Sequence, residues 1–76
     1  MYLMKTTNTA PAMMTTTIAS DETGFVVLVN DELVARCDRG YAETVLAARI
    51  EQGWRVWRVI RDTDGRLLDA LLTIRI

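Results

Sequence analysis

Histidine is absent from this 76-residue sequence, and cysteine, serine and proline occur once each. Catalytic systems of the Ser-His-acid or Cys-His kind need a histidine beside the nucleophile, so one chain cannot assemble them. The usual nitrogen and sulfur ligands of metal ions are lacking too. The lone Cys37 cannot form a disulfide within the chain, which fits a reducing compartment.

The remaining acid–base groups are carboxylates, most of which fall in turn-like segments. Those in turns form the pairs Asp21 and Glu22, Asp31 and Glu32, and Asp62 and Asp64. Carboxylates at such positions usually cap turns in contact with water. The four glycines are spaced as turn and cap residues, without a phosphate-binding fingerprint. We therefore expect a protein that is not an enzyme and that needs no metal or other cofactor.

Long apolar runs are lacking as well. No stretch approaches the roughly 20 residues of a membrane-spanning helix, and the N-terminus lacks the apolar segment of a secretory signal. The sequence thus predicts a cytoplasmic protein with no membrane partner. Lysine occurs only at position 5, so every later basic side chain is an arginine, which can bind carboxylates or phosphates in bidentate fashion. The base composition of the gene would explain the same bias.

What the sequence does contain is typical of a small globular protein, with 50% hydrophobic and 25% charged residues and a net charge of −1. Residues 1–14 show neither a helical nor a strand period, and we expect them to form a flexible N-terminal tail. Residues 15–76 should form a single compact domain. A core of this size gives only marginal stability, so pairing with a second copy of the chain would help.

The C-terminal third, residues 54–76, predicts a β-hairpin, because two apolar runs flank one Asp-Gly turn. Two loops are compatible with that turn. A three-residue loop, Thr63–Gly65, pairs Asp62 with Arg66, whereas a two-residue loop at Asp64-Gly65 shifts the pairing by one residue. Such a shift exchanges the face on which each side chain of one strand lies.

We prefer the three-residue loop, because it brings one arginine to the apolar face of the hairpin instead of two. That arginine is Arg58, opposite Ala70. The other residues expected on this face are Trp54, Val56, Ile60, Leu68, Leu72 and Ile74. The second face then carries an exposed tryptophan with apolar and charged neighbours, namely Trp57, Val59, Leu67, Leu71, Arg55, Arg61, Asp69, Thr73 and Arg75. In the alternative register, Trp57 closes the core instead.

Upstream, residues 15–19 and 25–29 predict a hairpin around a turn at residues 21–24. The second of these strands is apolar on both faces, so it should lie inside the sheet. Residues 30–32 reverse the chain into a third strand at residues 33–37, and the turn can be centred on either Asn-Asp or Asp-Glu. One face of this third strand is expected to carry Leu33, Ala35 and Cys37.

Residues 39–52 predict the one helix, because Asp38 suits its N-cap and Gly53 suits the left-handed residue after its end. At 100° per residue, most apolar side chains fall on one half of this helix: Tyr41, Ala42, Val45, Leu46 and Ile50. Arg49 projects near the middle of that half. Its stem can lie over the core while its head reaches past the helix end, or it can pair with a carboxylate of the sheet or of a partner.

Together these elements predict an α+β fold in the order β-β-β-α-β-β, in which a mostly antiparallel sheet of four or five strands carries one helix packed on one face. One helix of about four turns cannot cover such a sheet. Its other face is left for solvent, for a second copy of the chain or for another protein.

Charge is unevenly distributed along the chain, which favours a binding function. Residues 54–76 hold five arginines against three aspartates, whereas residues 20–53 hold three arginines against seven carboxylates. A tryptophan beside arginine and leucine is the mixture found in interface hot spots. We therefore predict a partner-binding surface made of Arg55, Trp57, Arg61, Leu71 and Arg75.

The leading functional prediction is a noncatalytic protein-binding module that inhibits or assists a host protein by stoichiometric binding. The alternative is a homodimeric nucleic-acid-binding protein, in which the same arginines contact phosphates and Trp57 stacks on bases. The charge of residues 20–53 would repel a long nucleic acid, so we rank this alternative second.

Two resemblances bear on these predictions: the first adds a HicB-like antitoxin-type regulatory protein to the alternative, and the second supports the leading prediction. Residues 21–50, DETGFVVLVNDELVARCDRGYAETVLAARI, resemble the hairpin, strand and helix of HicB-type antitoxins, which implies a toxin as partner and dimerisation. In its size, its single domain and its lack of catalytic residues, the whole chain is similar to phage- or plasmid-encoded inhibitors such as anti-CRISPR proteins. That resemblance implies binding to a host effector.

Overall fold

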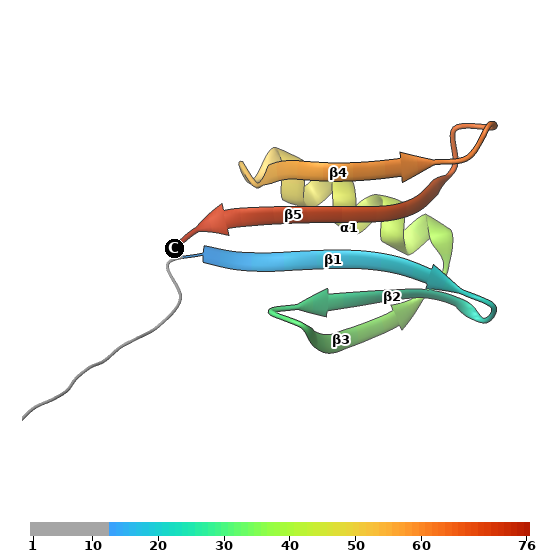
Figure 1. The fold of residues 1–76 in the computed structure, drawn as a ribbon, viewed down its shortest axis with the longest axis horizontal. Coiled ribbons are helices and arrows are strands. Elements are labelled where there is room, and N and C mark those ends of the chain that lie inside the picture. Colours follow the sequence, from blue (N-terminus) through green and yellow to red (C-terminus); the bar gives the residue numbers. More distant parts are fainter. Residues whose placement is uncertain (1–12) are drawn as a thin grey trace, which may run out of the picture.

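A computed structural model describes residues 13–76, in which the elements follow the predicted order β-β-β-α-β-β. Their bounds are β1 Met13–Asp21, β2 Gly24–Val29, β3 Glu32–Cys37, α1 Arg39–Glu51, β4 Arg55–Arg61 and β5 Leu67–Arg75. All strand pairs are antiparallel and the sheet order is β3-β2-β1-β5-β4, so β1 is the central strand. The helix lies across one face of the sheet (Figure 1). The predicted α+β fold is confirmed.

The first strand begins two residues before the expected Thr15. Met13 and Met14, which were predicted to belong to the tail at 1–14, pair with Arg75 and Ile74 at the start of β1. The rest of that prediction concerns residues 1–12, which lie outside the described part of the chain.

The helix connects the two edge strands, β3 and β4, by crossing the sheet. Its N-cap is Asp38, whose Oδ1 accepts a hydrogen bond from the backbone N of Tyr41 at 2.8 Å. It ends at Glu51, and Gly53 follows with φ +94°. The predicted cap and stop residues are therefore confirmed, because both act through bonds within a few residues of the chain.

The core lies between α1 and the sheet. Its buried apolar residues are Ile18, Phe25, Val27, Ala42, Leu46, Leu67, Ala70 and Leu72. The buried side of the helix is centred on Ala42, Leu46 and Arg49, so Tyr41 and Ile50 fall on its two margins and are about half exposed, at 54% and 49%. These two residues thus lie at the edges of the apolar half of the helix and are not part of the core.

Arg49 takes neither of the two predicted positions. Its Nε donates a hydrogen bond to Oγ1 of the buried Thr16 at 3.1 Å, and its guanidinium lies 4.9 Å from the ring centre of Trp54. The head of the side chain thus stays over the sheet, and no carboxylate of residues 13–76 pairs with it. A hydroxyl and an aromatic face satisfy the charge in place of an acidic partner.

The β4–β5 hairpin has the predicted three-residue loop, because the backbone N of Asp62 donates to the O of Arg66 at 2.9 Å. Two bulges then change the register inside the hairpin. Trp57 is the extra residue on β4, and Leu68 is the extra residue on β5. Between the bulges the pairs are Arg58 with Leu71, Val59 with Ala70, and Ile60 with Asp69.

The predicted place of Arg58 opposite Ala70 is therefore wrong. Val59 takes that place and packs against the core, and Leu67, expected on the other face, is buried. Ile60, expected in the core, faces away from the helix and is 44% exposed. Burying a valine in place of an arginine avoids the cost of desolvating a charge, and the second bulge restores the register before the loop.

A third bulge, at Val34, corrects the prediction for β3. It places Leu33 opposite Leu28 on the face away from the helix, whereas Ala35 and Cys37 pack against the core. The predicted common face for the three residues is thus wrong for Leu33, because the extra residue reverses the alternation of side chains.

The turn before β3 is centred on Asn30 and Asp31, which have φ values of +52° and +68°. This conformation is that of a two-residue hairpin turn, and both residue types tolerate it. Asn30 also ties the turn to the central strand. Its Oδ1 accepts from the backbone N of Thr15 at 3.0 Å, and its own backbone N donates to the O of Thr15 at 2.9 Å.

The loop of the β4–β5 hairpin makes the free energy of unfolding depend on pH in the acid range. The carboxylate of Asp62 accepts from the backbone N of Arg66 at 3.0 Å and of Asp64 at 2.8 Å, and it pairs with the Arg66 guanidinium. These contacts, with the backbone bond from Arg66 first, lower the pKa of Asp62. The unfolded chain, in which an Asp titrates near about 3.9, therefore binds more protons at acid pH than the folded chain does.

We expect the free energy of unfolding of Asp62→Asn to fall less steeply than that of the wild type as the pH falls between about 5 and 2. The stabilisation by Asp62 is present above its unfolded pKa and is lost when the carboxylate of the folded state is protonated. Urea unfolding followed by tryptophan fluorescence at several pH values measures this. The control is Glu22→Gln in the β1–β2 turn, which should keep the wild-type acid slope. An unchanged slope in Asp62→Asn would contradict the role given to the loop.

Candidate functional site

Trp57 lies on the sheet face opposite α1, here called the uncovered face, and its side chain is fixed although it is exposed. Its residue is 53% exposed. The indole Nε1 donates to Oγ1 of Thr73 at 2.7 Å, and the guanidinium of Arg55 lies 4.2 Å from the ring centre. Of the two positions predicted for Trp57, the structure has the outward one. A large ring held from both sides offers contact area at little loss of rotamer freedom.

The uncovered face carries apolar side chains on both sides of its central strand. Thr17 of β1 pairs with Leu28 on one side and with Leu71 on the other, and Leu28 in turn pairs with Leu33. These four residues form one row across the sheet. Ile60 and Trp57 extend the apolar surface on β4, so large exposed side chains lie on both edge strands.

Two arginines on this face, Arg55 and Arg75, have no acceptor in the described chain. One of the nine basic residues is a lysine, so eight are arginines. Six have partners: Arg36 with Asp21, Arg39 with the O of Leu67, Arg49 with Thr16, Arg58 with Asp69, Arg61 with Glu43, and Arg66 with Asp62 and Asp64. No carboxylate or hydrogen-bond acceptor within residues 13–76 pairs with Arg55 or Arg75. Both line the same hollow.

This hollow, of about 340 Å³, lies where β4 begins and β5 ends. Its lining residues are Met13, Gly53, Arg55, Trp57, Thr73, Ile74 and Arg75. Three of the five predicted site residues are thus brought together, and Leu71 lies beside them on the same face. An aromatic ring and two unpaired guanidiniums are suited to a carboxylate-bearing partner.

The fifth predicted residue, Arg61, is not part of this surface. After the second bulge it lies next to Leu67, and its Nη1 is 3.1 Å from Oε2 of Glu43 on the helix and 3.0 Å from the O of Gly65. It therefore ties the end of the hairpin to α1. Alternation along β4 could not reveal this, because the two bulges change which face each residue occupies.

Four residues of the hollow were not among the predicted site residues: Met13, Gly53, Thr73 and Ile74. Thr73 was placed on the correct face, but its hydrogen bond to Trp57 depends on the bulge at that position. Met13 lies in the segment that was expected to be a tail, and no signal in the sequence pointed to it.

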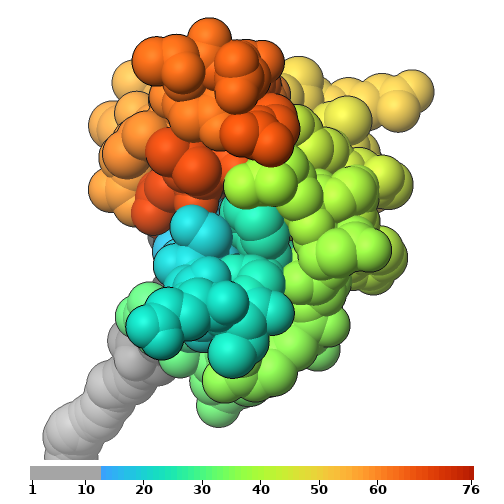
Figure 2. Space-filling model, turned by 90° about the vertical axis from the view of Figure 1, so that its right-hand side faces the viewer, coloured from blue at the N-terminus to red at the C-terminus, as the bar shows by residue number. Residues whose placement is uncertain are grey.

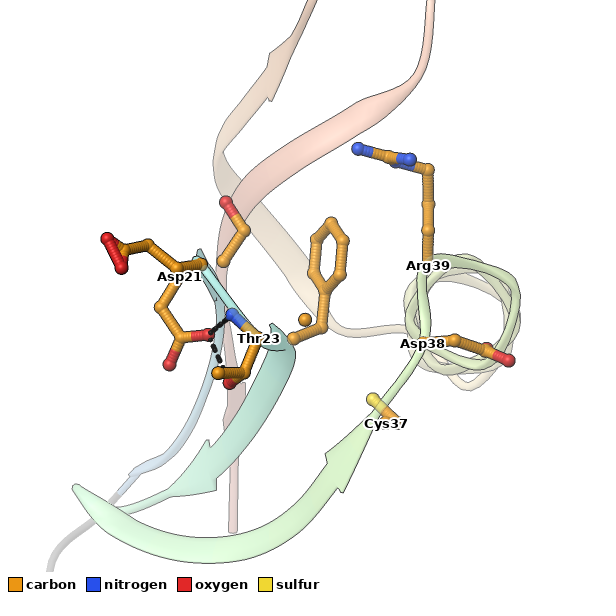
Figure 3. A pocket seen from close by; sticks show the side chains of 9 residues that line it. Asp21, Thr23, Cys37, Asp38 and Arg39 are labelled. Atoms are coloured by element: carbon orange, nitrogen blue, oxygen red, sulfur yellow. Dashed lines mark hydrogen bonds between the residues drawn. The ribbon is translucent and has the colours of Figure 1, made fainter.

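A larger hollow, of about 620 Å³, lies at the opposite end of the sheet, and its polar groups already have structural roles. The Asp21–Thr23 turn and the segment Cys37–Arg39 face each other across it (Figure 3). Figure 2 shows this end of the molecule, where the β1–β2 turn in teal and the start of the helix in green lie below the β4–β5 loop in orange.

Apart from Glu22, the polar side chains around this larger hollow are engaged or unreactive. Oδ1 of Asp21 accepts from the N and Oγ1 of Thr23, both at 2.8 Å, and these bonds lower the pKa of Asp21. Asp38 caps the helix, and Arg39 donates to the O of Leu67 and lies 5.3 Å from the ring centre of Phe25. Burial raises the pKa of the Cys37 thiol, which makes it less reactive. The smaller hollow is therefore the candidate site.

Comparisons with models of protein families, with curated proteins and with solved structures find no match to this chain. Within residues 13–76, no helix has the length and apolar character needed to span a membrane. That part of the chain also has no group of three or more Cys, Asp or Glu side chains placed to hold a metal ion. What the protein binds is therefore inferred from the side chains of its uncovered face.

Proposed function

We propose that the protein is a noncatalytic module that binds another protein through the uncovered face of its sheet, with Trp57 and Arg55 in the contact. The observation that carries this proposal is the state of Trp57, which is half exposed yet held by Thr73 and Arg55. Fixed aromatic side chains beside arginine are the residues on which binding energy concentrates in interfaces.

The rest of the uncovered face supports the same proposal. The apolar surface continues from Trp57 across every strand except β1, through Leu28, Leu33, Leu71 and Ile60. An apolar centre bordered by charged side chains is the usual composition of a protein–protein interface. The described chain leaves this surface open, since its one helix occupies the opposite face (Figure 1).

The finer form of the proposal is a stoichiometric inhibitor or accessory protein of the anti-CRISPR-like type, carried by a phage or plasmid and directed at a host effector. Its support is the small size of the chain, the lack of histidine and the resemblance described above. A toxin would be the partner if the likeness to HicB-type antitoxins is the relevant one.

Binding of nucleic acid by the uncovered face ranks below binding of protein. It relied on Arg55, Arg61 and Arg75 beside Trp57, but Arg61 pairs with Glu43 on the helix. Arg58, which lies on this face after the bulge, pairs with Asp69. Arg55 and Arg75 are then the cations left for phosphates on this face, and the leucines on the strands beside β1 would not favour phosphates.

Affinity capture with mass spectrometry tests the proposal. We expect the wild-type chain to retain a protein from the lysate of its host, and Trp57→Ala to lose it, because truncating a hot-spot residue costs about 2 kcal/mol or more, roughly 30-fold in affinity. Circular dichroism and thermal unfolding should show that the fold is kept, since Trp57 is outside the core.

The matched control is Tyr41→Ala, which removes an aromatic side chain with 54% exposure from the helix instead of from the sheet. Its capture should equal that of the wild type. If Trp57→Ala and Tyr41→Ala retain the same proteins as the wild type, the uncovered face is not the binding surface and the proposal fails.

A further inference from the structure

Bulges protect both edges of the sheet from pairing with a strand of another chain, so a partner is expected to contact the face of the sheet instead. Edge strands without protection pair with strands of other chains, and bulges are one device that prevents this. Both edge strands have one, at Val34 in β3 and at Trp57 in β4. Addition of a partner strand to either edge is disfavoured, which leaves the uncovered face as the open apolar surface of the described chain.

Side chains on this face increase in size from the middle of β1 to the edge strands, apart from the large Met13 and Arg75 at the end where the hollow lies. The central strand β1 contributes Thr15, Thr17 and Ala19, whose neighbours Thr16 and Ile18 point to the core. The flanking strands β2 and β5 contribute medium side chains, among them Leu28 and Leu71. The edge strands contribute the largest ones: Leu33 and Arg36 on β3, and Arg55, Trp57, Arg58 and Ile60 on β4. The strip of small side chains along the middle of β1, with the larger ones of its neighbours on either side, is here called the trough.

The width of this trough suits one helix. Strands lie about 4.8 Å apart, so β2 and β5 are about 10 Å from each other, which is close to the diameter of a helix. On the opposite face of the same sheet, α1 contacts these two strands, β2 and β5. One helix therefore covers the central strand and its two neighbours, and the trough offers the equivalent position on the uncovered side.

The charge of the trough specifies which helix fits. Its side chains include four arginines, Arg36, Arg55, Arg58 and Arg75, and two aspartates, Asp21 and Asp69, which already pair with Arg36 and Arg58. An excess of two positive charges remains, at the end where β4 begins. A second copy of the chain would bring two such basic faces together, and the like charges would repel.

We infer that the trough over β1 binds an amphipathic helix of another protein, whose apolar stripe contacts Leu28, Leu71 and Trp57 and whose flanking aspartates or glutamates pair with Arg55 and Arg75. This rests on the proposed function and specifies its partner. Helix-in-groove recognition of this kind uses apolar anchors at i, i+3 or i+4, and i+7. A helix of about 18 residues matches the length of the nine-residue strand β1.

Selection from two displayed peptide libraries tests the inference. One library holds helix-forming peptides of about 18 residues with variable surface positions, and the other holds unstructured peptides of the same length. The wild-type chain should enrich helix-forming peptides that carry an apolar stripe flanked by Asp or Glu. Enrichment of strand-like alternation, of basic peptides or of no peptide would overturn the inference.

The best enriched peptide is then synthesised and titrated by fluorescence anisotropy. Trp57→Ala and Arg55→Glu should each weaken binding by at least about tenfold. A peptide in which one flanking Glu is replaced by Arg should bind Arg55→Glu more tightly than the original peptide does. It should not bind the wild type more tightly. Tyr41→Ala on the opposite face should bind as the wild type does. Equal affinity of all four chains would overturn the inference.

Failure of this inference is distinguishable from failure of the proposed function. If capture from lysate depends on Trp57 but no acidic helix is selected, the uncovered face binds protein of another kind. If neither capture nor peptide binding depends on Trp57, both fail. Two other results would indicate a different occupant of the trough and also overturn the inference. One is self-association in sedimentation at high concentration that Arg55→Glu abolishes. The other is a shift of single-stranded oligonucleotides at low salt.

Discussion

Leu72→Ala should lower the free energy of unfolding by about 2 to 5 kcal/mol, the range for truncating a buried leucine. Leu72 is fully buried on β5, where it pairs with Thr16 of the central strand and with Val56 of β4. Small domains have about 5 to 15 kcal/mol in total, so the variant should be close to unfolding at room temperature. Urea unfolding followed by circular dichroism measures the difference.

The matched control is the same substitution at Leu33, which is 53% exposed on an edge strand. Its free energy of unfolding should change by less than about 1 kcal/mol, because little apolar area is withdrawn from water there. Equal losses from Leu72→Ala and Leu33→Ala would show that the core does not lie between the sheet and α1.

Gly24→Ala should destabilise the fold by about 1 to 3 kcal/mol, although it adds a single methyl group. Gly24 begins β2 with φ +140°, a conformation that residues with a side chain rarely adopt. A Cβ at this position would also lie 3.0 Å from the backbone O of Cys37, and a backbone atom cannot move aside as a flexible side chain can. Strain and a close contact therefore act together.

Gly40→Ala is the control with the same chemical change. Gly40 lies in the first turn of α1, and a Cβ there would be 3.5 Å from Oδ1 of Asp38, an ordinary contact. Because alanine loses less backbone freedom on folding than glycine does, this variant should gain up to about 1 kcal/mol. The midpoints of thermal unfolding should move in opposite directions, and a stabilising Gly24→Ala would contradict the geometry of the β1–β2 turn.

Local signals in this protein led to correct predictions. Asp38 and Gly53 bound the helix, and the loop at Thr63–Gly65 closes on Asp62 and Arg66 as expected. Each of these features depends on hydrogen bonds between residues at most four positions apart, so the residue types and their spacing were sufficient. The order of elements and the fold class followed from the same kind of evidence.

The faces of the strands were less predictable, because three bulges interrupt the alternation of side chains. Arg58 and Ile60 lie opposite to their expected faces, and Leu33 leaves the face of Ala35. A bulge is favoured where one extra residue exchanges a charged side chain for an apolar one against the helix. That exchange depends on what packs opposite the strand, which the order of residues along the strand does not contain.

The candidate surface was predicted in part for the same reason. Arg55, Trp57 and Arg75 line one hollow with Leu71 beside them, whereas Arg61 contacts Glu43 on the helix. By itself, the sequence determined the order of the elements, the ends of the helix, the lack of histidine chemistry and the concentration of arginine in the last third. Only the tertiary structure decided which arginines are paired, that Trp57 points away from the core, and that β1 is the central strand of the sheet. Those outcomes depend on bulges and on contacts between residues far apart in the chain, where burial of apolar area competes with the desolvation of charge.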